Sequence, residues 1–405
     1  MRGFIAAFMA VLMLAVAGCA DSGPGETDWL NKEYSAIEEA AKDSTVRFYM
    51  WGGSAQINQW VDTYVAEEVR NRYGITLVRV PMDASVFVNK LLTEKAAGKT
   101  SGTIDLLWIN GENFKKCRQA DALFGPYADK LPNFQKYVDR KLAAHDFGFP
   151  TDGYETPYGT AQFVFEYDSA RQSGHPAAFA NLKEWVKKNP GRFTYPQPPD
   201  FTGSAFIRQA FYAVTGGSDQ YLGGWDEALF NRNAPKLWAY LNDLKPYLWQ
   251  EGRAYPKNVA ALDTLFARGE VDINMSYHPM HAQSKILEGT YPESVRTFIM
   301  KEGSIFNLHF TAIPFNASNK PGAMVVANFL MSPEAQLSKL DPANWGDFPA
   351  LDNTLLPDEM REAMQAVDLG EPTLGPDVLG AAAVPEIAAE YVEALERGWE
   401  ENVLR

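Results

Sequence analysis

Four aromatic residues stand at or just beyond the ends of predicted β-strands, where their rings could hold a small molecule. They are Trp51, Trp108, Phe201 and Tyr277. A flat ring can stack on a sugar or a heteroaromatic ring, and it attracts a quaternary amine by about 0.5–2 kcal/mol. The alternative for Trp51 and Trp108 is ordinary packing in the core or at its rim. We treat the four rings, together with Tyr158, as candidate ligand contacts.

Polar groups near these rings favour ligands of opposite charge. Glu112, which follows Asn110 at the start of a predicted helix, could pair with a cation or a hydroxyl group, or could simply be favoured there by the helix dipole. Asp200 could line the same site or cap the helix that follows it. Backbone amides of two turns could donate to an anion; the turns are Gly52, Gly53, Ser54 and Thr202, Gly203, Ser204. A zwitterion, or a cation that carries hydroxyl or phosphate groups, would suit both the acidic side chains and the backbone amides.

Metal and catalytic chemistry receive little support from the sequence. Pro279 opposes a helix that would carry both His278 and His281, and no run of carboxylates or thiols accompanies them, so we expect no metal site. Without a histidine in the site, ligand affinity should change little between about pH 6 and 8. No nucleophile elbow, His-Glu-x-x-His or CxxC motif is found, so we assign no catalytic residue and no cofactor. A glycosidase needs only two carboxylates and stays open as an alternative.

Alternating strands and helices must position these residues. Strands or extended runs are predicted at 45–50, 75–80, 104–109, 159–167, 192–195, 271–276 and 310–314. Helices are predicted from 54 to 65, at 86–97, 205–214, 261–268 and 322–331, and from about 384 to the end. Such alternation predicts parallel sheets covered by helices on both faces. Ligands of open α/β sheets bind beyond the carboxyl ends of the strands, where the aromatic residues stand.

Charge and the first residues indicate an exported protein. The net charge of −14 and the pI of about 4.9 oppose binding to nucleic acid. Arg2 precedes an apolar run at 4–16, which is too short for a hydrocarbon core of about 30 Å and is typical of a signal peptide. Small residues then lead to Cys19 and resemble a bacterial lipobox; the alternative is an ordinary signal peptide with a chance cysteine. We predict a lipoprotein held to a membrane by acyl chains on Cys19, in the periplasm or at the cell surface. Cys117 then has no disulfide partner.

Several segments resemble the extracytoplasmic solute-binding proteins of ABC importers. They are RFYMWGGSAQINQW (47–60), DLLWINGENF (105–114), TPYGTAQFVFEYD (156–168), PPDFTGSAF (198–206), LFARGEVDINMSY (265–277) and FLMSPEAQ (329–336). The first, second and fourth are similar to a narrower, YnjB-type branch. The similarity runs in order over about 45–348.

This resemblance implies a two-lobed α/β periplasmic-binding-protein fold (type II). Each lobe would hold a mainly parallel sheet flanked by helices, and two extended crossovers at 156–167 and about 308–315 would join the lobes. The implied parts are a signal peptide (1–18), a lipidated tether and N-terminal segment (19–43), lobe 1 (44–157 with 310–345), lobe 2 (166–306) and a C-terminal helical segment that packs on the lobes (346–405).

The resemblance also implies a function. A monomer without enzymatic activity would close its lobes on a small organic solute and deliver it to an ABC permease in the membrane. The aromatic and acidic residues favour a cationic or zwitterionic solute. A carbohydrate-binding protein of the same fold stays open as an alternative.

Overall fold

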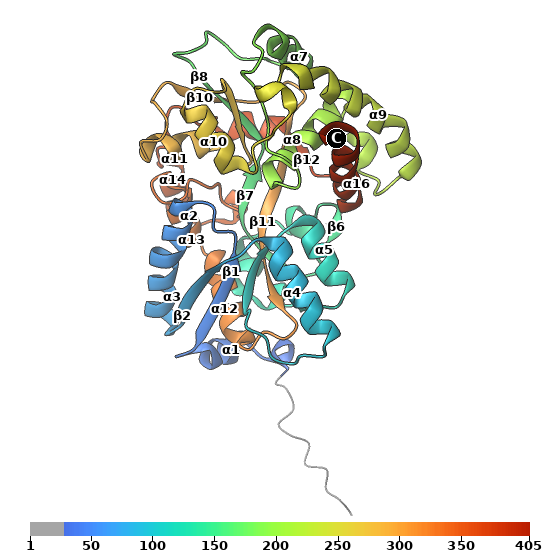
Figure 1. Ribbon diagram of the computed structural model, residues 1–405. Helices are drawn as coiled ribbons and strands as arrows, with labels where there is room; N and C mark the ends of the chain where they lie inside the picture. Colours follow the sequence, from blue (N-terminus) through green and yellow to red (C-terminus); the bar gives the residue numbers. More distant parts are fainter. Residues whose placement is uncertain (1–27) are drawn as a thin grey trace, which may run out of the picture.

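Two α/β lobes make up the computed structural model, which describes residues 28–405 (Figure 1). The predicted signal peptide, the lipobox and Cys19 lie outside the described residues. Within residues 28–405, no helix has both the length and the apolar character that crossing a membrane requires. We call the elements around the larger sheet lobe 1 and those around the smaller sheet lobe 2.

Lobe 1 is built on a sheet with the strand order β12-β11-β3-β1-β2. Its strands are β1 (Thr45–Met50), β2 (Thr76–Pro81), β3 (Leu106–Ile109), β11 (Ser304–Pro314) and β12 (Ala383–Pro385). β1 pairs in parallel with β2 and β3, as predicted, whereas β11 runs antiparallel to β3. Shorter strands are β4 (Leu123–Phe124), which pairs with β11, and the hairpin of β5 (His145–Asp146) and β6 (Phe149–Pro150).

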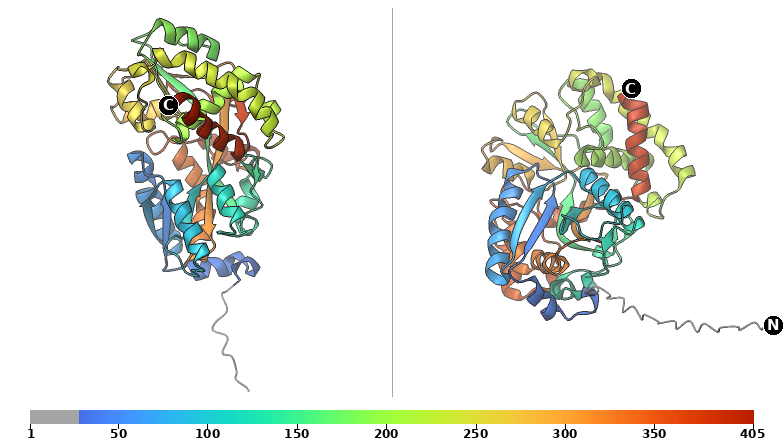
Figure 2. Two further views of the ribbon diagram at one scale, coloured as in Figure 1. Left: turned by 45° about the vertical axis from the view of Figure 1, so that its right-hand side comes forward. Right: turned by 60° about the horizontal axis from the view of Figure 1, so that its bottom comes forward.

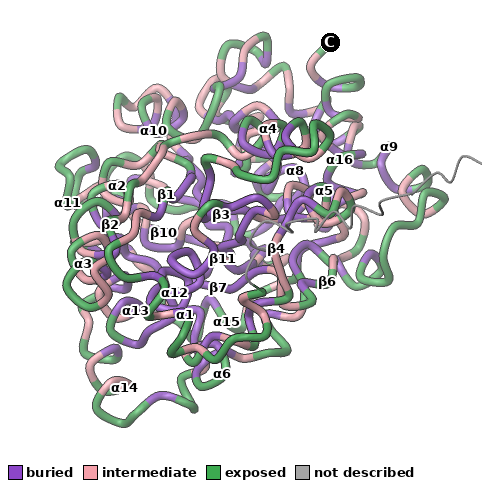
Figure 3. The backbone as a smooth tube through the Cα atoms, turned by 90° about the horizontal axis from the view of Figure 1, so that it is seen from below, coloured by how far each residue is buried: buried purple, intermediate pink, exposed green. Residues whose placement is uncertain are grey.

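Helices cover both faces of this sheet because side chains alternate along β1. Phe48 and Met50 lie in one buried cluster with α12, and Tyr49 lies in another with α4 and α5. The helices are α1 (Tyr34–Ala41), α2 (Ala55–Trp60), α3 (Ala66–Tyr73), α4 (Ala84–Ala96), α5 (Gly111–Gln119), α6 (Pro132–Tyr137), α12 (Lys320–Leu330) and α13 (Pro333–Leu340). Seen from below, the largely buried strands β3 and β11 lie near the middle of the molecule, and more exposed helices such as α3 lie toward its edge (Figure 3).

Lobe 2 holds a sheet with the order β10-β8-β9. Its elements are β8 (Val164–Asp168), α7 (Phe179–Lys188), α8 (Phe201–Thr215), α9 (Glu227–Leu244), α10 (Val259–Ala267), β9 (Ile273–Ser276), α11 (His281–Leu287) and β10 (Val295–Phe298). Both strand pairs are antiparallel, so the prediction of a mainly parallel sheet is wrong for this lobe. The reason is that β8 continues the crossover β7 away from lobe 1, whereas its partners β9 and β10 both run in the opposite direction.

The predicted strand at 192–195 is not part of this sheet. Asp272 N–H donates to the carbonyl of Arg192 (2.8 Å), so the segment lies beside the chain that leads into β9. Pro196, Pro198 and Pro199, just beyond it, have no amide hydrogen and cannot extend a ladder.

The two crossovers are strands β7 (Glu155–Gln162) and β11, which pair antiparallel between the lobes (Figures 1 and 2). Their register runs from Phe306 opposite Gln162 to Ala312 opposite Glu155, with an irregularity between His309 and Phe310. β7 leads almost directly into β8 of lobe 2. The lobes are therefore joined by a paired ribbon, which is the part of the molecule that a hinge motion would bend.

The C-terminal segment packs on both lobes. Its elements are α14 (Asp358–Gln365), α15 (Pro376–Ala382), β12, α16 (Ala389–Trp399) and a π-helical turn (Glu400–Leu404). Leu356 and Met364 join the core of lobe 1, whereas Tyr391, Leu395 and Trp399 join the core of lobe 2.

Candidate functional site

Two of the four predicted rings meet between the lobes. The ring centroids of Phe201 and Tyr277 lie 5.1 Å apart, and Phe147 of lobe 1 lies 6.1 Å from Phe201. Phe201 is 41% exposed, which leaves its ring available to a ligand. Tyr277 is buried, and its hydroxyl donates to Glu386 (2.6 Å), so it supports Phe201 from behind.

A buried ion pair lies beneath these rings. The Arg208 guanidinium of α8 donates twice to the Glu386 carboxylate, from Nε and from Nη2, at 2.8 Å in each case. Its Nη1 donates to the Ser204 hydroxyl (2.7 Å), and its centre lies 5.3 Å from the Phe147 ring centroid. Sequence reasoning missed Arg208 as a site residue. The signal was a single arginine within the apolar helix sequence AFIRQAFYAV, because a buried guanidinium requires an acidic partner.

Three more carboxyl groups lie around this ion pair. Burial, and then the charge of Glu396, raise the pKa of Glu112 to about 7. Burial also raises the pKa of Glu396, although the Ser204 hydroxyl donates to its carboxylate (2.6 Å). Burial raises the pKa of Asp146 to about 8, although Gly111 N–H and the Asn307 amide donate to it. Two cations, Arg208 and Lys116, thus face four acids, and the region favours protons or a positively charged group.

The turn at the start of α8 caps its own helix. Asp200 Oδ1 accepts from the amides of Thr202 and Gly203, at 3.0 Å each, and Oδ2 accepts from Val259 N–H (3.2 Å). These two amides are therefore occupied and not available to an anion. Gly203 is required by close packing, because a Cβ there would lie 2.0 Å from the carbonyl oxygen of Pro196.

The loop after β1 also caps a helix. Ser54 Oγ accepts from Ile57 N–H (3.3 Å) at the start of α2. Trp51 in this loop is 38% exposed, and a Cβ on Gly53 would lie 2.1 Å from its ring. Gly52 packs against Pro81. In the described chain, Trp51 makes no ring contact with the other three predicted aromatic residues.

Trp108 and Tyr158 belong to a separate aromatic cluster. The Trp108 ring centroid lies 5.8 Å from Tyr158, 5.0 Å from His309 and 5.6 Å from Trp345. Tyr158 is buried, and its hydroxyl has no hydrogen-bond partner in the structure. The Asn110 amide donates to the Leu308 carbonyl (2.7 Å) and so fixes the end of β3 against the crossover β11. The structure therefore divides the predicted residues into the Phe201 group, the Trp108 group and the Trp51 loop.

The two histidines considered as metal ligands differ in charge. Burial lowers the pKa of His278 to about 4, and its Nε2 lies 2.7 Å from the Gly346 carbonyl. Burial opposes the charge of His281, but Asp263 and Glu166 raise its pKa to about 10. Its ring nitrogens lie 2.9 Å from Glu166 and 3.2 Å from Asp263. A protonated imidazole with both nitrogens engaged is an ion-pair partner rather than a metal ligand.

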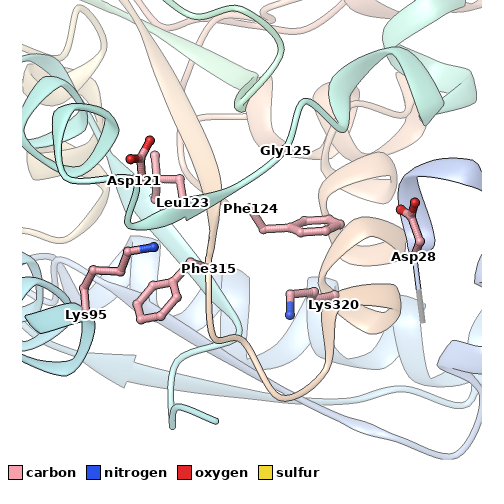
Figure 4. A pocket seen from close by; sticks show the side chains of 8 residues that line it. All are labelled: Asp28, Lys95, Asp121, Leu123, Phe124, Gly125, Phe315 and Lys320. Atoms are coloured by element: carbon pink, nitrogen blue, oxygen red, sulfur yellow. The ribbon is translucent and has the colours of Figure 1, made fainter. Parts of the chain in front are cut away.

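Two surface hollows lie away from these groups. One, of about 390 Å³, lies in lobe 1, where Lys95 and Lys320 stand 4.6 and 5.5 Å from the ring centroids of Phe315 and Phe124 (Figure 4). The other, of about 460 Å³, is lined by Asn242, Lys245, Pro246 and Glu251 of lobe 2. None of the predicted site residues lines either hollow.

Comparisons with known proteins agree with this architecture. The family model of the bacterial extracellular solute-binding proteins matches residues 59–366. The chain is 42% identical to the protein YnjB of Escherichia coli (strain K12) over 370 residues, which cover 91% of this chain and 93% of that protein.

Solved structures show the same fold at lower identity. The periplasmic binding protein AfuA of Actinobacillus pleuropneumoniae, with fructose-6-phosphate bound, is 14% identical with a TM-score of 0.63, covering 89% of this chain and 98% of that chain. The spermidine/putrescine substrate-binding protein PotD of Streptococcus pneumoniae is 16% identical with a TM-score of 0.56, covering 87% and 98%. The predicted two-lobed fold is confirmed by these likenesses.

Replacing His281 tests the charge assigned to it. Because its pKa is about 10 in the folded chain and about 6.5 when unfolded, its stabilising effect is complete below about pH 6.5 and is lost as the pH rises toward 10. His281→Gln should lower the free energy of unfolding at pH 6 by about 3–5 kcal/mol, since Glu166 and Asp263 lose their cation. Its stability should also fall less steeply from pH 7 to 10 in urea titrations. Equal profiles for His281→Gln and the exposed control His145→Gln would contradict the assignment.

Proposed function

Since the chain belongs to the family of bacterial extracellular solute-binding proteins, we propose that it is the solute-binding component of an ABC importer. It captures a small organic solute between its lobes and delivers it to a membrane permease. The family binds solutes and is not a family of enzymes, so the glycosidase alternative is dropped. The proposed lobe 1 spans residues 44–157 with 310–345, and the proposed lobe 2 spans residues 166–306. We propose that the protein acts as a monomer.

The solute proposed is a cation or a zwitterion. The observation that carries this choice is the Glu112 carboxyl beside Glu396, with the exposed ring of Phe201 in the same region. Burying a positive group between two acids relieves their repulsion, whereas an anion would add to it. Of the two structural relatives, AfuA holds a sugar phosphate, and PotD is named for the polyamines spermidine and putrescine. The surplus of acids over the two cations Arg208 and Lys116 favours the second kind of ligand for this chain.

Binding is proposed to act through closure of the lobes about β7 and β11. A ligand that contacts both lobes stabilises the closed state by its differential affinity for that state. Glu112 and Trp108 would contribute from lobe 1 and Phe201 from lobe 2. The Trp51 loop is proposed to cover the ligand from lobe 1.

Export and lipidation are also proposed, on the lipobox alone. Labelled palmitate should be incorporated into the wild-type protein and lost in Cys19→Ala. Equal labelling of the wild type and of Cys19→Ala would show that Cys19 does not carry the acyl chains.

Glu112→Gln tests the charge of the solute. Calorimetric titrations with spermidine, choline and glycine betaine should find at least one ligand, whereas fructose 6-phosphate should not bind. The variant should bind that ligand about tenfold more weakly at pH 8 than the wild type does, a loss of about 1.4 kcal/mol. Because the pKa of Glu112 is about 7, wild-type affinity should rise from pH 6 to 8, in contrast to the sequence-based expectation. The exposed Glu401→Gln makes the same charge change as a control. If fructose 6-phosphate binds and none of the other three compounds does, the proposal of a cationic or zwitterionic solute is wrong.

Trp51→Ala tests the proposed cover. Removal of an exposed ring should leave the melting temperature nearly unchanged but weaken ligand binding about three- to thirtyfold if the ring stacks on the solute, as cation–π and stacking energies of about 0.5–2 kcal/mol imply. Trp225→Ala is a matched control, because Trp225 is also 38% exposed but packs on Phe230 and Tyr391 of lobe 2. Equal ligand affinities of Trp51→Ala and Trp225→Ala would show that Trp51 does not contact the solute.

A further inference from the structure

The helix α16 is fastened to lobe 2 by buried contacts. Tyr391, Leu395 and Trp399 lie in the core of that lobe, and the Trp399 indole N–H donates to the Tyr195 hydroxyl (3.0 Å). The strand β12, which precedes the helix, pairs with the Ser304–Phe306 end of β11, where Ile305 also lies in the lobe 2 core. Glu386, between β12 and α16, is held by Arg208 with both side chains almost fully buried. Separating α16 from lobe 2 would leave a buried charge without its partner, which is strongly unfavourable.

The same helix meets lobe 1 through two ion pairs, one at the surface and one in which the lysine is largely buried. Lys115 of α5 pairs with Glu390, and Lys116 pairs with Glu393 (3.1 Å). The Lys116 and Glu393 side chains are 46% and 45% exposed. The hydrogen bond from Lys115 holds the pKa of Glu390 below its usual value, although burial opposes this. Exposed ion pairs are weak and are screened by salt, so they can separate where buried contacts cannot.

Like charges oppose this attraction deeper in the contact. Burial, and then the charge of Glu396 on α16, raise the pKa of Glu112 on α5, whereas Lys116 and Arg208 oppose this shift. Asp146 also lies near Glu112, and Glu396 itself faces Arg208, Lys116 and Glu393. The outer rim of the α5–α16 contact therefore holds two attractive ion pairs, whereas its interior holds two buried acids that are costly to ionise together. Part of the attraction at the rim is thus offset within the contact.

We propose that α16 is an ionic clasp, carried by lobe 2, that closes on α5 of lobe 1 and sets the balance between the open and closed protein before a solute binds. The clasp consists of Lys115, Lys116, Glu390 and Glu393. This inference rests on lobe closure in the proposed function, but not on the identity of the solute. It assigns the end of the chain a part in the closing motion.

Small-angle scattering of the solute-free protein tests the clasp. The radius of gyration of the wild type should increase as NaCl is raised from about 50 mM to about 1 M, because screening weakens the pairs. Lys116→Glu should increase it already at low salt, with a fall in the closed-to-open ratio of about two- to fivefold. The exchanged pair Lys116→Glu with Glu393→Lys should restore the wild-type radius and its salt dependence.

Lys183→Glu is the matched control, because Lys183 pairs with Asp243 within lobe 2. It should leave the radius of gyration unchanged at every salt concentration. A wild-type radius that does not respond to salt would overturn the clasp, and so would an equal response of Lys116→Glu and Lys183→Glu. If Lys116→Glu fails to fold, the wild-type salt titration and the exchanged pair still decide. A failure to bind cations would refute the proposed solute but would not alter these radii.

Discussion

The buried pairing of Arg208 with Glu386 is the interaction on which the region between the lobes depends. A guanidinium inside a lobe core is tolerated only with a carboxylate in bidentate geometry, and Glu386 supplies both oxygens at 2.8 Å. The same carboxylate accepts the hydroxyl of Tyr277, and the same guanidinium orients Ser204 toward Glu396. This ion pair thus helps to position Tyr277 behind Phe201, the C-terminal segment that carries Glu386, and the second acid Glu396.

The contacts that join the two lobes differ in strength, and their placement suits a closing motion. The crossover β7 is paired with residues 306–312 of β11, with one irregularity, and the two strands join the lobes covalently. On the side of α16, the contact with lobe 2 is apolar and buried, whereas the contact with α5 is charged and partly exposed. The chain belongs to the family of bacterial extracellular solute-binding proteins, and this distribution of contacts suits the proposed closure on a solute.

Local pattern predicted most of the first lobe, because its elements are set by nearby residues. The predicted strand 45–50 coincides with β1, and the glycine and serine after it do end the strand and begin a helix. The second lobe was harder, since strand direction there is set by the crossover and 192–195 is kept out of the sheet by contacts far along the chain. One of the two roles considered for Asp200, capping the helix that follows it, depends only on neighbouring residues, and the hydrogen bonds of Asp200 at the start of α8 are those of a helix cap. Glu386 and Glu396 were beyond sequence reasoning, because only tertiary packing brings residues from the end of the chain to α8.

The separation of Arg208 from Glu386 by 178 residues also bears on how the polypeptide acquires its shape. A chain that emerges from its amino end exposes α8 long before the acid that neutralises it, and before β12 completes the edge of the first sheet. Without Glu386, the interior of the second lobe would carry an uncompensated cation and would have to remain partly solvated. A chain cut short before residue 386 would therefore leave Arg208 without its partner in this core.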